Sequence, residues 1–192
     1  NLYCPICGQL KIERYENNHP TGDFFCSNCE SDFELKSKQC KSGKISNKIN
    51  DGAYDTMISR ITSSRNPNFF FMTYKNYSVS NFILIPNHFF TPQIIEKRKP
   101  LAPTAKRAGW VGCNIDISTI PDSGKIFIVK NNVELNHEDV IRKYAKTKSL
   151  KTSNIESRGW LLDTLSCVEK IPEKEFSLNQ IYSFEKELKI KH

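Results

Sequence analysis

Two runs in the middle of the chain carry its densest hydrophobic pattern. Residues 69–74 and 82–85 are mostly aromatic or branched, and the polar segment 75–81 separates them. Apolar runs of this length are typical of buried β-strands, so we expect two strands joined by a turn. Residues 33–37, where apolar and charged side chains alternate, and residues 125–130 predict two further strands.

Other segments show the spacing of an amphipathic helix. Residues 50–62 place Met57, Ile58 and Ile61 on one face, and Asp51 can cap this helix. A last helix is expected to start at the cap residue Ser177 and to run to residue 189. The remaining expected helices span residues 91–97, 137–148 and 159–170.

Two polar stretches between these elements predict loops. Residues 38–48 are rich in Lys and Ser, and residues 98–112 combine Pro, Gly and basic residues. The resulting order of strands and helices predicts an α/β fold with a mixed sheet flanked by helices. A length of 192 residues is typical of one domain, or of one domain with a small appendage.

The charge balance narrows the choice of partner. The chain has 28 Lys and Arg residues against 21 Asp and Glu residues, which gives a net charge of +7. An excess of positive charge favours a polyanionic partner, most often nucleic acid, although a basic and indifferent surface has the same composition. No apolar run approaches the roughly 18 residues of a membrane span, so we expect no membrane partner.

The cysteines form two pairs with the spacing of metal ligands. Cys4 and Cys7 make one C-x-x-C pair, and Cys26 and Cys29 make a second pair after an 18-residue interval, residues 8–25. This spacing is typical of a four-cysteine zinc site, which is structural because four thiolates leave no open position for substrate. Buried or disulfide-linked cysteines are the alternative. The seven cysteines of a chain without a recognisable secretion signal indicate a reducing compartment, and Cys40, Cys113 and Cys167 have no partner spacing.

The second cysteine pair is enclosed by charged residues with a possible catalytic spacing. Asp23, Glu34 and Lys36 form the pattern D-x10-E-x-K. In a strand, Glu34 and Lys36 project from one face and Leu35 from the other. Two converging carboxylates can hold Mg²⁺, and a nearby lysine can then activate water or stabilise charge on a phosphate. A salt-bridged surface pair on a strand has the same pattern.

The loop that follows residue 96 is the strongest candidate for a DNA contact. Basic side chains contact phosphates and guanine edges, and the indole of Trp110 offers an apolar face beside Ala105 and Ala108. The alternatives are that the indole is a core anchor and that the basic loop is merely solvated. The candidate residues of this loop are Lys97, Arg98, Lys99, Lys106, Arg107 and Trp110.

Two polar turns are weaker candidates. Asn50 and Asp51 precede one expected helix, and Ser157 and Arg158 precede another. Backbone N–H groups at a helix start can bind a phosphate, and Arg158 can clamp one. A plain helix cap is the alternative at both places.

Several motifs in order along the whole chain carry a family resemblance. The segment around Asp23 and Glu34 resembles the PD-(D/E)xK nuclease superfamily, with Gly22 where proline is frequent. The chain as a whole resembles the DpnI-like, methyl-directed type II restriction endonucleases. The motifs are C-P-x-C (4–7), E-N-N-x-P (16–20), D-F-x-C-x-x-C (23–29), F-E-L-K-S-K (33–38), I-N-D-G-A-Y (49–54), N-P-N-F-F-F (66–71), R-K-P-L-A-P-T-A-K-R-A-G-W (98–110) and S-R-G-W (157–160).

The resemblance implies a zinc-supported PD-(D/E)xK core with catalytic residues Asp23, Glu34 and Lys36. It implies that Asp23, Glu34 and the Leu35 carbonyl bind Mg²⁺, and that the substrate is duplex DNA with N6-methyladenine in both strands of GATC. For that substrate we expect the Trp110 indole to cover the N6-methyl group, with help from Ala105 or Ala108. The resemblance further implies a bacterial cytoplasmic enzyme, and we expect a monomer. The implied domains are a nuclease domain over residues 1–172 and, over residues 173–192, the first helix of a truncated C-terminal winged-helix domain.

Two other functions remain open at this point. A zinc-containing module that binds modified DNA without cutting it has the same charge and cysteine pattern. A nicking or repair nuclease can be built on the same core with a different sequence preference. The intact set of Asp23, Glu34 and Lys36 favours an enzyme.

Overall fold

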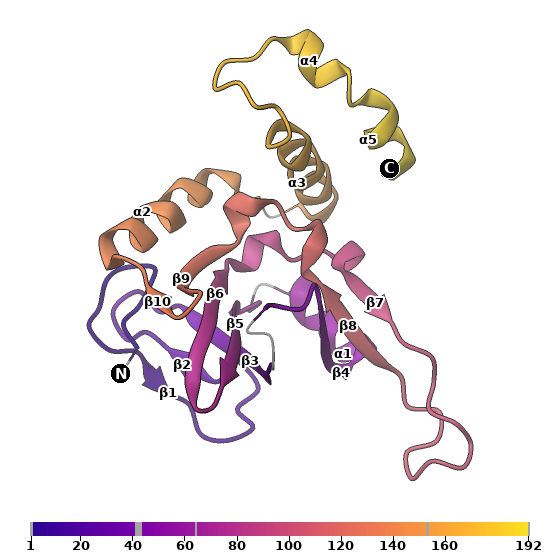
Figure 1. The fold of residues 1–192 in the computed structure, drawn as a ribbon. Coiled ribbons are helices and arrows are strands. Elements are labelled where there is room, and N and C mark those ends of the chain that lie inside the picture. The colour runs from indigo at the N-terminus through magenta and orange to yellow at the C-terminus, as the bar shows by residue number, and fades with distance from the viewer. Residues whose placement is uncertain (1, 41–43, 64, 153, 192) are drawn as a thin grey trace.

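The computed structural model describes residues 2–40, 44–63, 65–152 and 154–191. Within these ranges the chain forms a seven-stranded sheet, a three-stranded sheet and helices packed around them (Figure 1). The predicted α/β fold with a mixed sheet is therefore confirmed. None of the described helices is long and apolar enough to cross a membrane.

The large sheet has the strand order β1-β2-β3-β5-β6-β9-β10. Only the β3–β5 pair is parallel among the described strands, and the other neighbours run antiparallel. The predicted hairpin is β5–β6, and its turn residues Asn76 and Tyr77 both have positive φ, as a tight hairpin turn requires. The strands are β1 Glu13–Arg14, β2 Phe24–Phe25, β3 Asp32–Gln39, β5 Asn68–Lys75, β6 Ser78–Ile85, β9 Ile126–Lys130 and β10 Val133–Glu134.

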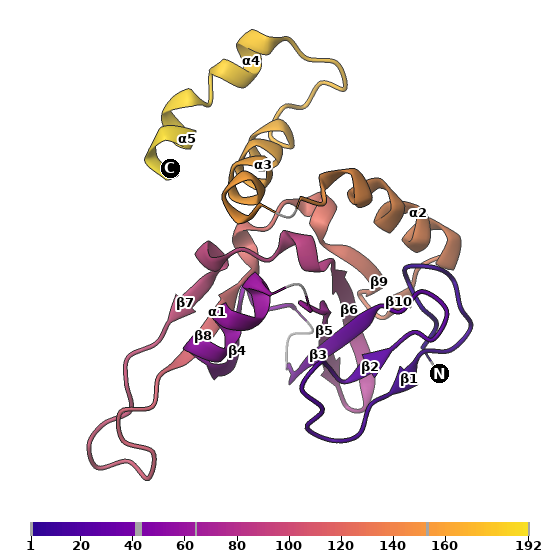
Figure 2. The same cartoon turned by 180° about the vertical axis from the view of Figure 1, so that it is seen from behind.

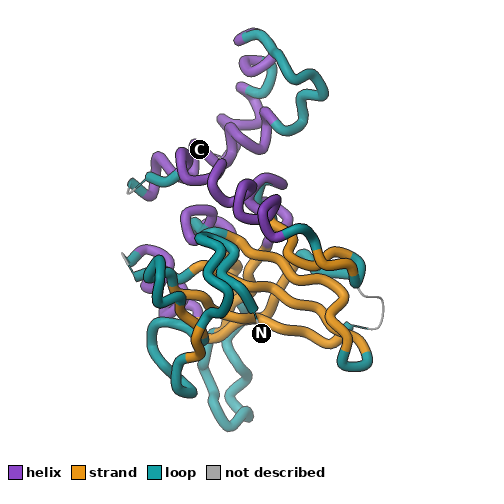
Figure 3. The backbone as a smooth tube through the Cα atoms, turned by 90° about the vertical axis from the view of Figure 1, so that its left-hand side faces the viewer, coloured by secondary structure: helices purple, strands orange, loops and turns teal. Residues whose placement is uncertain are grey.

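Both faces of this sheet are buried, which explains the continuous apolar runs of β5 and β6. Phe69 and Phe71 belong to a core shared with α1 (Tyr54–Thr62), the small sheet and α3 (Ile155–Val168). Phe70 points to the opposite face, into a core shared with α2 (His137–Thr147) and the cysteine-rich N-terminal segment. The N-terminal segment thus covers one face of the sheet (Figure 3).

The small sheet carries a long projecting loop. Its strand order is β4 (Lys48–Ala53), β8 (Gly112–Asp116), β7 (Ile95–Lys97), and all its pairs are antiparallel. Helix α1 follows β4 directly, with Met57 and Ile61 buried in the core. Residues 98–111, which we call the β7–β8 loop, extend away from the body of the molecule (Figures 1 and 2).

The C-terminal helices lie on the side of the molecule opposite the β7–β8 loop (Figure 1). Helix α3 is followed by α4 (Leu178–Tyr182) and α5 (Glu185–Lys191). Two ion pairs, Lys170–Glu187 and Lys191–Asp163, connect α5 with α3 and the residues just after it. The short 3-10 helices are η1 Asn87–Phe89, η2 Pro92–Ile94, η3 Ile117–Thr119, η4 Asp122–Gly124 and η5 Lys148–Leu150.

Some predicted boundaries were wrong. Residues 48–53 form β4, so α1 begins at Tyr54 and Asp51 is not its cap. Helix α3 begins at Ile155 after the Asn154 cap, so Ser157 and Arg158 lie inside it. The other differences are that residues 92–97 form one 3-10 turn and β7, and that the helix predicted over 177–189 is divided into α4 and α5. Residues 41–43 of the predicted 38–48 loop lie outside the described residues.

Candidate metal centres and nucleic-acid interface

The four cysteines predicted to bind metal come together. Their Sγ atoms all lie within 4.8 Å of one another, with Cys4–Cys29 at 3.7 Å and Cys7–Cys26 at 3.6 Å. Four thiolates around one zinc ion, each at about 2.3 Å, lie about 3.8 Å apart in a tetrahedron. The cluster can therefore hold a zinc ion with little change of geometry.

The protein environment makes these thiols unequal. Burial raises the pKa of the Cys4 and Cys29 thiols. Burial also acts on Cys7, but hydrogen bonds to its sulfur, led by the Asn28 amide at 3.3 Å, outweigh it and lower the pKa of Cys7 to about 7. Because a zinc ligand must be a thiolate, metal binding at this cluster releases protons from the buried cysteines.

The second cysteine pair lies in the connection between β2 and β3. Cys26 and Cys29 enclose a tight turn in which the Glu30 N–H donates to the Cys26 carbonyl at 2.8 Å. Asp23 lies just before β2, and Glu34 and Lys36 lie on β3. The cysteine cluster therefore sits at the closed end of the hairpin that carries the predicted catalytic residues.

Asp23 is held directly beside the middle of β3. Its N–H donates to the Phe33 carbonyl at 2.8 Å, and its Oδ2 accepts from the Leu35 N–H at 2.7 Å. Gly22 makes this approach possible, because a Cβ at that position would lie 2.7 Å from the Phe33 carbonyl oxygen. The hairpin thus brings Asp23 next to Glu34 and Leu35.

Glu34 and Lys36 project from the same face of β3, as the strand period predicts. Leu35 packs into the opposite core. Glu34 is almost fully buried, and one of its carboxylate oxygens forms an ion pair with the Lys36 ammonium. Burial on its own would lower the pKa of Lys36, but the carboxylates of Glu34 and Asp51 outweigh it, so the pKa of Lys36 is raised and the ammonium is charged at neutral pH.

Asp51 belongs to this cluster, which the sequence interpretation did not anticipate. Its Oδ1 lies 2.5 Å from the Lys36 Nζ. Asp51 faces the cluster because β4 alternates: Ile49 packs against the core and Asn50 is exposed on the other side. Asp51 is therefore a partner of Lys36 and not the helix cap that the sequence suggested. A DNA contact at Asn50 and Asp51 stays a prediction.

Arg60 is a second residue that the sequence analysis missed. It lies in the last turn of α1 and forms an ion pair with the other carboxylate oxygen of Glu34. The same guanidinium donates to the carbonyls of Pro20 and Thr21, each at 3.0 Å. One arginine in an amphipathic helix has no local signal that distinguishes it, and only the packing of α1 brings it to Glu34.

The β7–β8 loop carries the predicted basic residues on an ordered hairpin. The Leu101 and Gly109 N–H groups donate to the Trp110 and Leu101 carbonyls, each at 3.0 Å. Trp110 is half-buried, lies outside both hydrophobic cores, and packs over Gly112 with the Arg107 guanidinium 4.5 Å from its ring centroid. Trp110 is therefore not a core anchor.

The base of this loop lies near the carboxylate cluster. Cys113 in the middle strand β8 pairs with Asp51 on one side and Lys97 on the other. Two strand spacings, about 10 Å, therefore separate Lys97 from Asp51. Cys113 is buried in the core, as expected for a cysteine without metal partners. Lys97, Lys99, Lys106 and Arg107 are exposed, whereas Arg98 is half-buried.

Arg158 lies apart from this group. Its guanidinium donates to the carbonyls of Phe90 at 3.3 Å and Thr152 at 3.0 Å. These bonds attach the first turn of α3 to the core, which favours a structural role over the predicted phosphate clamp. Ser157 likewise lies inside α3 and uses its N–H to bond the Asn154 cap at 2.9 Å.

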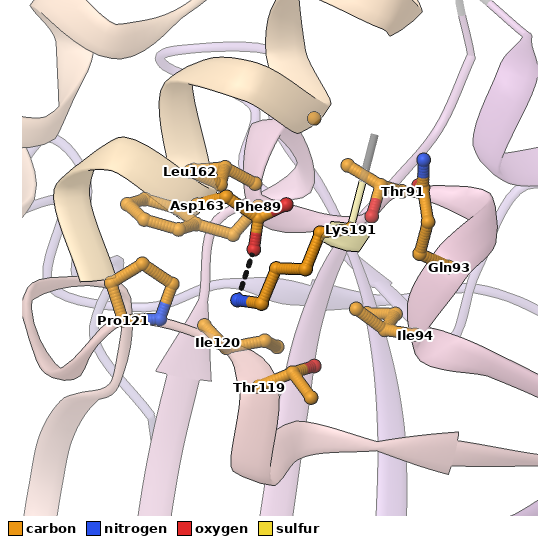
Figure 4. Close-up of a pocket in the computed structure, with 11 residues that line it drawn as sticks. Phe89, Thr91, Gln93, Ile94, Thr119, Ile120, Pro121, Leu162, Asp163 and Lys191 are labelled. Carbon is orange, nitrogen blue, oxygen red and sulfur yellow. Dashed lines mark hydrogen bonds and ion pairs between the residues drawn. The ribbon is translucent and has the colours of Figure 1, made fainter. Parts of the chain in front are cut away.

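A cavity between the core and the C-terminal helices is separate from these residues. It has a volume of about 250 Å³, and its lining includes Phe89, Ile120, Leu162 and the Asp163–Lys191 ion pair (Figure 4). None of the predicted catalytic or DNA-binding residues lines it. A long polyanion needs an open charged surface rather than such a cavity, so we assign the candidate site to the carboxylate cluster and the β7–β8 loop.

Two family models match the chain. The model of the Dam-replacing family, DpnI, matches residues 1–153. The model of the Dam-replacing HTH domain matches residues 156–192, which include most of α3 and all of α4 and α5. Helix-turn-helix units bind DNA through a helix, so this second match supports a DNA-binding role for the C-terminal helices.

Proposed function

The chain belongs to the Dam-replacing family of DpnI-like proteins, and on that premise we propose that it is a Mg²⁺-dependent endonuclease of the PD-(D/E)xK type. Its substrate is duplex DNA that carries N6-methyladenine in GATC. The proposal rests above all on one observation: Asp23, Glu34 and Lys36 lie together at the open end of a hairpin whose other end carries four cysteines.

The metal ligands we propose are the carboxylates of Asp23 and Glu34 and the Leu35 carbonyl. A bound Mg²⁺ would supply Lewis-acid stabilisation of phosphate charge and a more acidic water. Glu34 fits this role because its carboxylate is buried and each of its oxygens, paired with one cation, keeps a further lone pair for a metal ion. Lys36, charged and held between Glu34 and Asp51, would turn its ammonium to the phosphate and stabilise the developing negative charge.

We propose that the ion at Cys4, Cys7, Cys26 and Cys29 is a structural zinc. Its donor set has the composition and spacing of such sites. It would hold the β2–β3 connection and so fix Asp23 relative to Glu34, without taking part in the chemistry. Because thiolate ligands need a reducing environment, we place the protein in the bacterial cytoplasm, and we expect it to act as a monomer.

The β7–β8 loop is the proposed reader of DNA. Lys99, Lys106 and Arg107 are exposed basic residues on this loop, and the exposed Lys97 ends β7 at its base. No acidic residue occurs between residues 97 and 115. Trp110 offers an apolar ring that can cover the N6-methyl group in the major groove. We also propose that residues 1–172 form the nuclease unit and that residues 173–192 belong to a winged-helix unit. The helix-turn-helix match supports the existence of the second unit, although it starts at residue 156, inside α3.

Cleavage of two plasmids tests the proposal. One plasmid carries adenine-methylated GATC and the other is identical but unmethylated, and each is digested with Mg²⁺ or with a chelator. We expect Mg²⁺-dependent cutting of the methylated plasmid only. Binding of methylated DNA without any cutting would replace the enzyme with a non-catalytic reader of modified DNA, and cutting of both plasmids would remove methyl dependence from the proposal.

The Lys36→Ala variant tests the assigned role of the lysine. Loss of the ammonium should reduce the cleavage rate by about 10²–10³-fold, the usual effect of removing one electrostatic contact to the transition state, and leave DNA binding unchanged. Lys38→Ala is the matched control, because Lys38 lies two residues further along the same strand and is exposed. Equal activity of the two variants would exclude a catalytic Lys36.

The Trp110→Ala variant tests the reader. It should reduce the preference for methylated over unmethylated DNA while the maximal rate of cutting stays within a small factor. An unchanged preference would exclude Trp110 as the methyl sensor.

A further inference from the structure

The Arg60 guanidinium connects two segments that carry the proposed metal ligands. On one side it forms the ion pair with Glu34 on β3. On the other side it donates to the carbonyls of Pro20 and Thr21, three and two residues before Asp23. The planar fork of arginine suits this arrangement, because it presents several N–H donors in fixed directions at once.

The segment before Asp23 has few other attachments. Strand β2 consists of Phe24–Phe25 only, and its pairing with β3 begins one residue after Asp23. Residues 16–20 are exposed, and the His19 N–H forms a local bond to the Glu16 carbonyl at 3.2 Å. Besides Arg60, the main attachment of this stretch is the His19 ring, which stacks on Tyr15. Among the described residues, Arg60 therefore links this segment to a helix that packs on the core.

Helix α1 is a firm support for such a link. Met57 and Ile61 are 3% and 1% exposed, so the helix is fixed to the hydrophobic core on the face next to Arg60. The Arg60 side chain is itself largely buried, with 22% of its surface exposed, against 10% for the Glu34 side chain. A guanidinium desolvated to this extent is held in one orientation rather than exchanging among solvent-exposed rotamers.

We propose that Arg60 is a positioning residue that sets the distance between the Asp23 and Glu34 carboxylates by tying residues 20–21 to Glu34. This inference rests on the proposed function, because it assigns metal binding to those two carboxylates. Arg60 holds one oxygen of the Glu34 carboxylate and, through residues 20–21, the segment that leads into Asp23. It does not touch substrate.

Positioning by Arg60 and competition by Arg60 change metal affinity in opposite directions. The sign of the change in an Arg60 variant therefore distinguishes the two roles. A cation that merely occupies Glu34 competes with a metal ion, so its removal tightens metal binding. A positioning residue does the reverse: residues that orient metal ligands typically contribute about 10–100-fold to metal affinity. Arg60→Met should therefore weaken metal binding at least about 10-fold.

Direct metal titration tests this prediction without relying on cleavage. Mn²⁺ binding to the zinc-loaded protein is measured by electron paramagnetic resonance for the wild type, Arg60→Met, Arg60→Lys and Arg65→Met. Arg65→Met is the matched control, since it removes the same charge from an exposed residue just after α1. Glu34→Gln identifies which part of the Mn²⁺ signal belongs to the proposed site.

The expected order of Mn²⁺ affinity is wild type equal to Arg65→Met, then Arg60→Lys, then Arg60→Met. Tighter binding by Arg60→Met, or full recovery with lysine, would overturn the proposal, because a single ammonium reproduces the charge but not the fork. Absence of any Glu34-dependent Mn²⁺ signal in the wild type would overturn the proposed metal site and the role of Arg60 with it.

Amide hydrogen exchange provides a second readout that is independent of metal. The Asp23 and Leu35 N–H groups form the two bonds that hold Asp23 against β3. Arg60→Met should accelerate exchange at these two amides and leave the amides of the β5–β6 hairpin unchanged. Acceleration throughout the sheet would reduce Arg60 to a general stability residue, and no acceleration at Asp23 and Leu35 would overturn the link.

Discussion

Gly22 is the residue at which a single methyl group should disturb the proposed catalytic cluster most directly. An added Cβ would lie 2.7 Å from the Phe33 carbonyl oxygen and 3.2 Å from its carbon, and both are backbone atoms of a paired strand. The segment would have to move outward and take Asp23 with it. This explains why the position needs a residue without a side chain.

We therefore predict that Gly22→Ala reduces the cleavage rate about 10-fold to 100-fold, since small misplacements of a catalytic group have effects of this size. DNA affinity should change little, because the proposed reader is on another element. Single-turnover cleavage and DNA titration measure the two quantities. Gly52→Ala is the control for thermal stability, because a Cβ there meets no atom within 4 Å; a Gly22→Ala variant with full cleavage activity would contradict the geometry.

His88 gives a second prediction at the scale of one residue. Its ring is 3% exposed, and burial, together with the charges of Lys151 and Arg158, outweighs a bond to the Thr147 backbone and lowers the pKa of His88 from 6.5 to about 4. The unfolded chain then binds a proton at a higher pH than the folded chain does. Stability contributed by neutral His88 is complete above pH 6.5 and is lost as the pH falls toward 4.

Between pH 7 and pH 5 the loss should be about 2 kcal/mol of the free energy of unfolding. Urea unfolding at the two pH values measures it. The decrease should be smaller by about that amount in His88→Gln, and His19→Gln should behave like the wild type because His19 is exposed. The same pH dependence in His88→Gln would show that His88 does not titrate as the structure indicates.

At the scale of elements, the sequence predicted what depends on hydrophobic pattern and ligand spacing. The β5–β6 hairpin, β9, α2 and the four-cysteine cluster were all predicted correctly, because continuous apolar runs and paired C-x-x-C motifs have few other solutions. Strand β4 was mistaken for the start of a helix, since Asn50 and Asp51 resemble a cap, and its pairing with β8 is a long-range contact without local signal.

The candidate site likewise contains residues that the sequence predicted and residues that only the packing brings in. Glu34 and Lys36 share a face because the strand period requires it. The contributions of Asp51 and Arg60 depend on how β4 and α1 pack against β3, and no spacing in the sequence encodes that. Arg158 shows that a motif alone does not fix a role. Its motif suggested a phosphate contact, whereas the structure bonds its guanidinium to the carbonyls of Phe90 and Thr152.

The cysteine-rich segment gives a prediction for an element. Cys4 and Cys26 are fully buried in the core that covers Phe33 and Phe70, so loss of the metal should open that face of the sheet. We expect a strong zinc chelator, or Cys26→Ser, to abolish cleavage and to accelerate amide exchange in β2 and β3. Structural zinc sites are worth on the order of 10 kcal/mol in small domains, so the effect should exceed that of any surface substitution.

Zinc released on unfolding can be counted with a chromogenic chelator. Cys40→Ser is the control and should retain one zinc ion per chain, because Cys40 is not part of the four-cysteine cluster. Addition of Zn²⁺, and not of Mg²⁺ alone, should restore the chelated wild type. Full cleavage activity of a zinc-free protein would refute the idea that the cluster fixes the position of Asp23.

At the scale of the whole molecule, the net charge of +7 is unevenly distributed over the surface that can meet DNA. The β7–β8 loop concentrates exposed basic residues without an acidic neighbour, whereas charges elsewhere are often paired, as in Arg142–Asp139 on α2 and Lys189–Glu185 on α5. Counterions released from DNA make affinity fall with salt in proportion to the number of phosphates that the protein neutralises. A lysine that contacts a phosphate should therefore affect the salt dependence of DNA affinity, whereas a lysine elsewhere on the surface should not.

We predict that Lys99→Gln combined with Lys106→Gln reduces the slope of log K against log salt concentration by about 2, because each substitution removes one lysine–phosphate interaction. The double variant Lys143→Gln, Lys146→Gln removes the same charge from exposed positions on α2, on another side of the molecule, and should leave the slope unchanged (Figure 1). Fluorescence anisotropy with a methylated GATC duplex at several salt concentrations measures both slopes. Because phosphates carry no sequence information, the loop variant should lose affinity equally for methylated and unmethylated duplexes. Equal slopes for the two double variants would mean that DNA affinity depends only on the net charge of the protein. The β7–β8 loop would then lose its proposed role in reading DNA.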